Sequence, residues 1–325
     1  MPLLGLVVRP RVNPVQDGGM TGVLIGFAII GTVILIGYIT GRSGVLGEHA
    51  PFVISRFTFF VLSPCLLFTV LADADVHELF SSLLLVSAIS ALLVCLIFLG
   101  VALIIFKRKL PESIIGALSS GYVNANNIGI PVAVYVLGNT AYSAPVILFQ
   151  LLVLAPIALT VLDISTNGRG SLWRTLLSPF RNPLIIGSAI GAAVAITGLE
   201  IPDAVMEPFR IIGAAAVPLV LINFGMSLHG QRALAPGSNR RDVVLATLLK
   251  LAVMPAIAWV LGAFVFNLDS EHLFAVVVLS TLPTAQNIFV YAQRYGRGQV
   301  VARDTILITT IGAVPVLVLV AALLT

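Results

Sequence analysis

The chain has 325 residues, of which 58% are hydrophobic and only 10% are charged, and its formal net charge is +4. This composition excludes an ordinary soluble domain and indicates an integral membrane protein. Its long apolar stretches are typical of an all-α helical bundle and not of a β-barrel. The two cysteines, Cys65 and Cys95, lie inside apolar stretches, so neither a disulfide framework nor a metal cluster is indicated.

Ten apolar stretches approach the roughly 20 residues that a helix needs to cross the hydrocarbon core. The predicted spans are residues 20–40, 50–71, 79–106, 112–137, 141–162, 183–198, 204–228, 243–266, 272–295 and 305–324. Residues 1–19 are rich in proline and glycine and are expected to form a disordered extension, with Met20 as the natural start. Residues 164–182 are expected to be a cytoplasmic linker between two halves, 20–163 and 183–325.

The charges of the predicted loops alternate in sign. Every odd loop is basic, from Arg42 after the first span to Arg294, Arg297 and Arg303 after the ninth. The even loops are acidic or uncharged. The positive-inside rule therefore predicts cytoplasmic odd loops, both termini outside and a location in the cytoplasmic membrane. Because the basic residues serve topology, no nucleic-acid partner is indicated.

The fourth span contains three amides, two glycines and a proline between Ser119 and Pro131. Proline lacks the N–H that bonds back one turn, and glycine loosens the backbone, so the helix is predicted to open near 124–131. Unwound backbone at membrane depth is tolerated where it is buried in protein or lines a watery cavity. The alternative is a proline-kinked helix whose asparagines bond to neighbouring helices.

A second copy of this stretch favours the open helix. Ser280, Ala285, Asn287 and Ile288 repeat Ser120, Ala125, Asn127 and Ile128 at a distance of 160 residues, and Pro156 matches Pro315 at 159. Five spans per repeat is an odd number, so the second repeat is predicted to be inverted. The broken fourth and ninth helices are then expected to cross near the midplane, where their N-terminal ends favour an anion.

With these motifs placed, the chain resembles the auxin efflux carrier family, which includes plant auxin exporters and bacterial malonate or malate carriers. The resemblance runs from Met20 onward and is carried by Asn124 with Gly129-Ile130-Pro131, by 224–228, and by Pro283 with Asn287. Asn126 and Asn127 depart from the family's smaller or apolar residues.

The resemblance implies an elevator-type homodimeric carrier. Helices 1, 2, 6 and 7 would form the scaffold, helices 3–5 and 8–10 the transport domain, and Asn124 would coordinate a carboxylate. The predicted substrate-binding residues are Asn124, Asn126, Asn127, Gly129, Pro131, Gln150, Pro283, Thr284, Gln286, Asn287 and Thr309. Gln150 and Thr309 occupy equivalent positions, and helix-to-helix hydrogen bonding is an equal alternative for them.

These features predict a secondary transporter of a small organic anion, working in the lipid bilayer by efflux or facilitation. The alternative is a sodium-coupled importer like the bile-acid symporters. No cofactor is indicated, and the coupling ion, Na⁺ or H⁺, is left open. Lys250 and Arg56 are expected to snorkel toward the membrane surface, with a functional role as the alternative for Lys250. The sequence contains no recognisable catalytic motif and no metal-ligand spacing, so an enzyme is not expected.

Overall fold

The computed structural model describes residues 20–47, 49–73, 82–167, 183–227 and 239–324. These residues form helices and connecting turns, with a single isolated antiparallel bridge between Val123 and Thr284. The extension predicted for residues 1–19 lies outside the described residues. So does most of the predicted linker, although helix α10 (Ala155–Asn167) continues through its first four positions.

Six of the described helices are long and apolar enough to cross a membrane: Ala50–Ala72, Ser82–Ile105, Ala141–Thr166, Asp203–Met226, Arg240–Val265 and Gln299–Leu324. Helical segments also occupy the other four predicted spans, two of them as interrupted pairs. The structure thus supports a polytopic all-helical membrane protein, and the ten-span topology stays a prediction.

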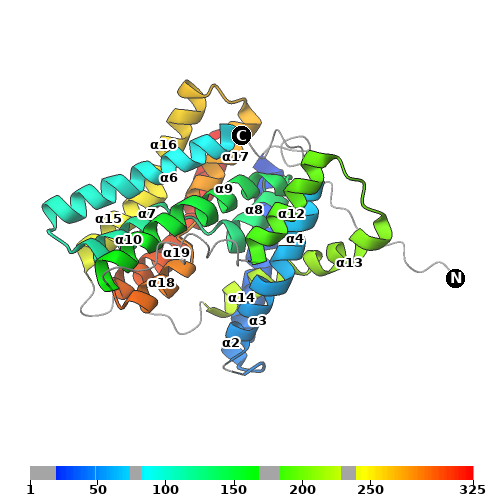
Figure 1. Cartoon of the computed structure of the whole chain (residues 1–325), viewed down its shortest axis with the longest axis horizontal. Helices are drawn as coiled ribbons and strands as arrows, with labels where there is room; N and C mark the ends of the chain where they lie inside the picture. The colour runs from blue at the N-terminus through cyan, green and yellow to red at the C-terminus, as the bar shows by residue number, and fades with distance from the viewer. Residues whose placement is uncertain (1–19, 48, 74–81, 168–182, 228–238, 325) are drawn as a thin grey trace.

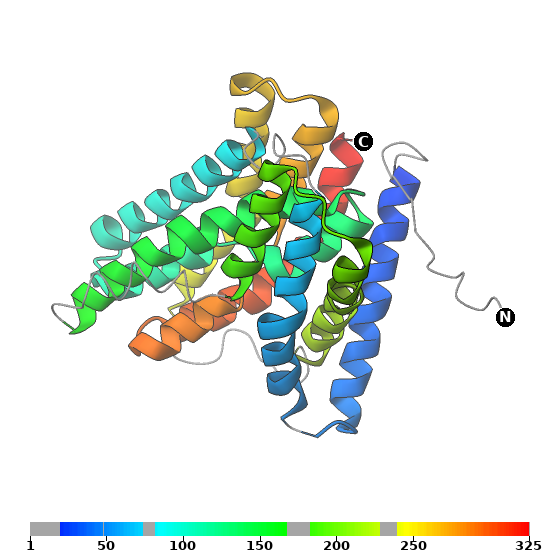
Figure 2. The same cartoon turned by 45° about the vertical axis from the view of Figure 1, so that its right-hand side comes forward.

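One group of helices stands upright on the right of Figure 2. Within it α2 packs along α14, and α4 packs against α12 and α13. The group consists of α2 (Met20–Ser43), α3 (Ala50–Phe57), the π-helical turn η1 (Thr58–Leu62), α4 (Ser63–Ala72), α12 (Pro183–Thr197), α13 (Asp203–Ala214) and α14 (Ala216–Ser227).

The α2–α14 contact depends on two glycines. A Cβ on Gly37 would overlap the backbone of Ile222, and one on Gly225 would overlap the backbone of Ile34. Small residues of this kind let two membrane helices approach at backbone distance. The two helices are therefore held in a tight pair, without room for a side chain between them.

A second group, the inclined group, fills the left and centre of Figures 1 and 2, and several of its helices, such as α6 and α10, are inclined to the first group. Here α6 packs on α7, α9, α16 and α17, while α19 packs on α15, α17 and α18. Its helices are α6 (Ser82–Gly100), α7 (Leu110–Gly121), α8 (Ile130–Tyr135), α9 (Ala144–Phe149), α10, α15 (Arg240–Leu248), α16 (Met254–Val260), α17 (Ser270–Thr281), α18 (Asn287–Tyr295) and α19 (Gln299–Leu324).

Two corners in this second group have the same backbone shape, 160 residues apart. The π-helical turns η2 (Val101–Ile105) and η8 (Leu261–Val265) are each followed by a residue with positive φ, Lys107 at 52° and Asn267 at 47°. In each corner, the N–H of the residue after this one donates a hydrogen bond of 2.8 Å to a carbonyl oxygen six residues earlier: Arg108 N–H to Ala102 O, and Leu268 N–H to Gly262 O. The helices that follow, α7 and α17, start and end at the same spacing.

The ends of these helices are fixed by polar contacts. Asp269 caps α17, since its carboxylate accepts from the His272 N–H at 2.9 Å, and this bond is the main cause that lowers the pKa of Asp269. At the opposite end of the group, Arg108 donates two hydrogen bonds to Asp242, at 2.7 and 3.1 Å, which ties the α6–α7 corner to α15.

Candidate functional site

Both broken helices open at the same place in the fold. Helix α7 ends at Gly121 and the chain resumes as the π-helical turn η3 (Ala125–Gly129), while α17 ends at Thr281 and α18 begins at Asn287. The two non-helical connections pair with each other: Asn124 N–H donates to Pro283 O at 2.8 Å, and Ala285 N–H donates to Tyr122 O at 3.1 Å. These two bonds satisfy four of the backbone groups that the breaks free from their helices.

The first break begins at Tyr122, slightly before the predicted 124–131. Pro131 does not end a helix at its own position, because the π-helical turn η3 runs directly into α8 and Pro131 follows that turn at the start of α8. Pro283 lies in the second connection, and its carbonyl accepts from Asn124.

Behind the paired connections, on the side of α7 and α19, Thr284 and Thr309 are both hydrogen-bonded. The Thr284 hydroxyl donates to Ser119 O at 2.6 Å, and the Thr284 N–H donates to the Thr309 hydroxyl at 3.1 Å. The Thr309 hydroxyl in turn donates to Thr305 O at 2.7 Å. Both threonines are completely buried. They lock the second connection against α7 and α19, and they leave no polar atom for a ligand.

Replacing Thr309 by valine is expected to destabilise the protein by roughly 1–3 kcal/mol, because a buried Thr284 N–H loses its acceptor while the shape is kept. Thermal unfolding in detergent measures the loss. Thr197→Val is the matched control, since the exposed Thr197 hydroxyl only bonds back to its own helix at Ala193 O. Equal melting temperatures for the two variants would contradict this role of Thr309.

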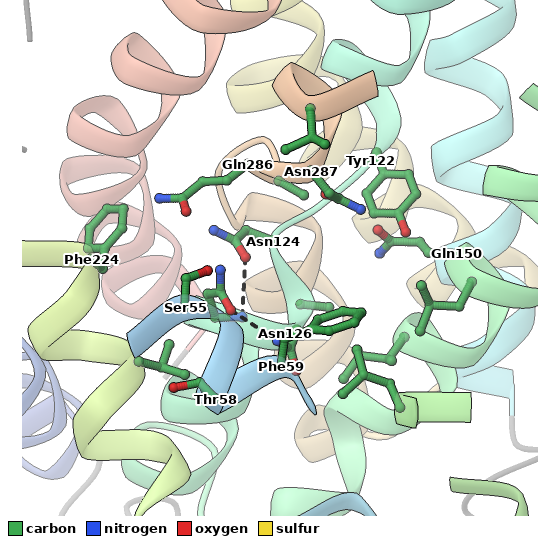
Figure 3. Close-up of a pocket in the computed structure, with 18 of the residues that line it drawn as sticks. Ser55, Thr58, Phe59, Tyr122, Asn124, Asn126, Gln150, Phe224, Gln286 and Asn287 are labelled. Carbon is green, nitrogen blue, oxygen red and sulfur yellow. Dashed lines mark hydrogen bonds between the residues drawn. The ribbon is translucent and has the colours of Figure 1, made fainter. Parts of the chain in front are cut away.

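A cavity of about 470 Å³ lies on the other side of the crossing, between the two groups of helices. Figure 3 shows amide side chains gathered in it from the first connection, η3, the π-helical turn η5 (Gln150–Leu154) and the start of α18. The first group contributes α3, η1 and α14, with Ser55, Thr58 and Phe224. Ligand pockets are typically about 300–1,000 Å³, so the cavity suits a small molecule.

The cavity collects buried polar atoms that lack hydrogen-bond partners. Among the described residues, nine buried side-chain atoms lack a partner, and six of them belong to residues that line this cavity: Thr58 Oγ1, Asn124 Nδ2, Asn126 Oδ1, Asn223 Oδ1 and both side-chain heteroatoms of Gln150. The other three, Glu112 Oε2, Thr247 Oγ1 and Thr305 Oγ1, lie outside its lining. An unmade hydrogen bond at a buried group costs about 1–3 kcal/mol. Such a concentration indicates groups kept available for a ligand.

Asn124 is held in place at the centre of this set. Its Oδ1 accepts from the Asn127 N–H at 3.2 Å, and so caps η3, which leaves its Nδ2 as a free donor. Asn126 Nδ2 donates to Asn127 Oδ1 at 3.0 Å, which leaves the Asn126 carbonyl oxygen free. Both bonds appear as dashed lines in Figure 3.

Arg56 is the sole formally charged residue among the described residues that line the cavity. It lies on α3, and its guanidinium sits 5.7 Å from the ring centre of Phe52 and 5.2 Å from that of Phe60. These cation–π contacts hold the side chain beside the cavity. Arg56 is exposed, and no acidic side chain of the described lining opposes it.

The predicted site residues divide into two sets. Those that line the cavity are Asn124, Asn126, Asn127, Gln150, Gln286 and Asn287; those outside its lining are Gly129, Pro131, Pro283, Thr284 and Thr309. The equivalent positions Gln150 and Thr309 therefore have different surroundings, with Gln150 unbonded at the cavity and Thr309 bonded behind the crossing.

Sequence reasoning missed the contribution of the first group: Ser55, Arg56, Thr58, Asn223 and Phe224. Asn223 and Arg56 are polar residues inside apolar spans, and that was the available signal. Lys250 also departs from its expectation: it does not snorkel, because its side chain is completely buried. Among the described residues, no cluster of three or more His, Cys, Asp or Glu could hold a metal ion.

Comparison with known proteins agrees with this architecture. A family model described as "Membrane transport protein" matches residues 23–321. The chain belongs to this family, that of the auxin efflux carriers. The family and the relatives found are transporters, not enzymes, and the apolar helices make this a multi-pass membrane protein.

Three curated relatives cover most of the chain. A protein of Rhizobium meliloti named "Putative malonate transporter" is 26% identical over 86% of this chain and 88% of its own length. The uncharacterized transporter YfdV of Escherichia coli is 25% identical over 81% of this chain and 85% of its own length. An uncharacterized transporter of Methanocaldococcus jannaschii is 22% identical over 87% of this chain.

Proposed function

We propose that this protein is a secondary transporter that moves a small organic anion, a carboxylate, across the cytoplasmic membrane. The observation that carries the proposal is the charge of the cavity: free amide atoms and one arginine line it, and no carboxylate of the described lining opposes them. A carboxylate accepts hydrogen bonds from amides and from a guanidinium, whereas a cation would be repelled by the positive charge of Arg56.

Helix ends add to this preference. The segments that resume after each break, η3–α8 and α18, begin at residues lining the cavity, from Asn124 and from Gln286. The N-terminal end of a helix carries a partial positive charge. Two such ends at one cavity favour an anion without placing a further ion in the membrane.

The proposed mechanism is an elevator. The cavity lies between the upright group and the inclined group, so it is bounded by one body that carries the crossing and by another that does not. Movement of the inclined group against the upright group would expose the cavity to each side in turn. The matched corners of η2 and η8, 160 residues apart, support the inverted five-helix repeat that this mechanism uses.

We further propose the predicted topology, with basic odd loops in the cytoplasm and both termini outside, and a homodimer joined through the upright group. Labelling of single cysteines placed at Arg42 and Glu200 in whole cells tests the orientation. The cysteine of Glu200→Cys should react with a membrane-impermeant maleimide, and the cysteine of Arg42→Cys should not. The opposite pattern would invert the topology.

The substrate class is tested by the melting temperature of the purified protein against a panel of carboxylates and neutral analogues, each with and without Na⁺. A ligand that binds the folded state raises the melting temperature by mass action. Malonate is the first probe, because a relative carries its name. A shift with malonate but not with malonamide supports an anion site; a shift that requires Na⁺ would favour the sodium-coupled alternative.

Replacing Arg56 by glutamine is expected to weaken carboxylate binding by about 10- to 100-fold, because a charge-assisted hydrogen bond contributes roughly 1.5–3 kcal/mol. Arg56→Lys keeps the charge but loses the planar fork, so its affinity should lie between the two. Calorimetric titration with malonate measures both. Unchanged affinity in Arg56→Gln would remove this arginine from the site.

A further inference from the structure

Lys250 is a lysine buried inside a membrane span and not used by the site described above. It lies in the π-helical turn η7 (Leu249–Val253) of the span Arg240–Val265 and is completely buried. Its Nζ donates to Ser280 O at 2.9 Å and to Met254 Sδ at 3.0 Å. Ser280 lies in the last turn of α17, just before the break. An ionisable group at this depth indicates function more often than stability.

The Lys250 amine has no carboxylate partner among the described residues. The elements packed against η7 are α6, α7, α15, α16, α17 and α19. Within them, Cys95 of α6 carries a buried thiol, which donates to Ala117 O at 3.2 Å. The other ionisable residues of these helices lie near helix ends. Two of them, Arg240 and Arg241, are at the start of α15. The others contact side chains other than Lys250: Glu112 contacts Arg297, Asp242 contacts Arg108, Asp304 contacts Arg303, Glu271 contacts Tyr142 and His272 contacts Asp269.

A buried ammonium without a counter-ion carries a large desolvation cost. An anion that enters the neighbourhood offsets part of this cost. Proton binding at Lys250 and anion binding in the cavity would therefore favour one another, and such linkage is reciprocal.

The side chain of Gln150 connects the surroundings of Lys250 with the large cavity. A second, small cavity of about 10 Å³ is lined by both partners of Lys250, Met254 and Ser280, and also by Gln150. Gln150 lines the large cavity as well, and both of its side-chain heteroatoms are without partners. The small volume is close to that of one water molecule. Gln150 thus lines both the large cavity and the small cavity that the two partners of Lys250 line.

We propose that Lys250 binds the proton that accompanies the organic anion, so that this protein is a proton-coupled carrier. The inference rests on the proposed function and names its coupling ion. In the step, a proton from water bonds to the lone pair of the neutral Lys250 amine and forms the ammonium as the carboxylate enters the cavity. On release the N–H bond breaks and the proton returns to water.

The test is calorimetric titration of the purified full-length protein with malonate in two buffers of different ionisation enthalpy. For wild type, the difference in heat between the two buffers should correspond to uptake of close to one proton per malonate. In the pH range where the free Lys250 amine is neutral, the affinity for malonate should fall by up to tenfold for each unit that the pH rises. In Lys250→Met the heats should be equal in both buffers and the affinity independent of pH. The control Cys95→Ser should keep the wild-type proton uptake.

Wild-type binding without proton uptake, or uptake that persists in Lys250→Met, would overturn the assignment of Lys250. Uptake that disappears in Cys95→Ser would move the proton to the thiol. If Lys250→Met does not fold, the wild-type proton count decides alone, because a count of zero refutes coupling. The absence of any binding heat from wild type across the carboxylate panel would instead refute the anion site itself.

Discussion

Alanine in place of Asn124 is expected to lower the affinity for malonate by about 10- to 100-fold or more. The Asn124 amide is the central group of the cavity, with its Nδ2 free and its Oδ1 fixed by the Asn127 N–H. Removing it deletes a hydrogen bond to a charged ligand, which contributes roughly 1.5–3 kcal/mol. It also deletes the cap of η3, which costs typically about 1 kcal/mol of stability.

These two losses are separable because the chain holds a second asparagine with the same local role. Asn139 Oδ1 accepts from the Ala141 N–H at 2.9 Å and caps a short helical turn outside the cavity. Asn139→Ala should lose a similar amount of stability and keep the affinity of wild type. Asn124→Asp keeps the cap but adds a negative charge, so it should fold and fail to bind malonate. Wild-type affinity in Asn124→Ala would refute the site.

How far the sequence predicted this site depends on which part of it is considered. The breaks were readable, because proline, glycine and repeated amides inside apolar spans cannot continue a regular helix. The positions of Asn124 and Gln286 at the cavity follow from those breaks. The exact opening at Tyr122 was not readable, since Pro131 is as compatible with a helix start as with a helix break.

Residues that depend on packing between the two groups of helices were beyond the sequence. Arg56 and Asn223 stand out in the sequence as polar residues inside apolar spans. They reach the cavity only because the upright group packs beside the crossing, and a single sequence does not show that contact. The repeat also misled in one respect. It made Gln150 and Thr309 equivalent, but the Thr309 hydroxyl is used by the Thr284 N–H, while Gln150 has no such partner.

Two glycines of α2 should respond to alanine in opposite directions. A Cβ on Gly37 would overlap the Ile222 carbonyl of α14, whereas a Cβ on the exposed Gly31 meets nothing within 4 Å. Gly37→Ala must therefore push α2 away from α14, and overpacking of this kind costs typically about 1–3 kcal/mol. Gly31→Ala should stabilise the same helix by roughly 0.5–1 kcal/mol, because glycine loses more backbone freedom than alanine on folding.

Thermal unfolding in detergent should therefore place wild type between the two variants. The order matters for the transport mechanism, because an elevator needs one body that stays fixed while the other moves. If Gly37→Ala melts with or above wild type, the α2–α14 pair is not tightly packed and the upright group cannot serve as that fixed body. If it melts lower while Gly31→Ala melts higher, backbone contact between α2 and α14 holds the upright group rigid, and the cavity gains a fixed wall at Phe224 of α14.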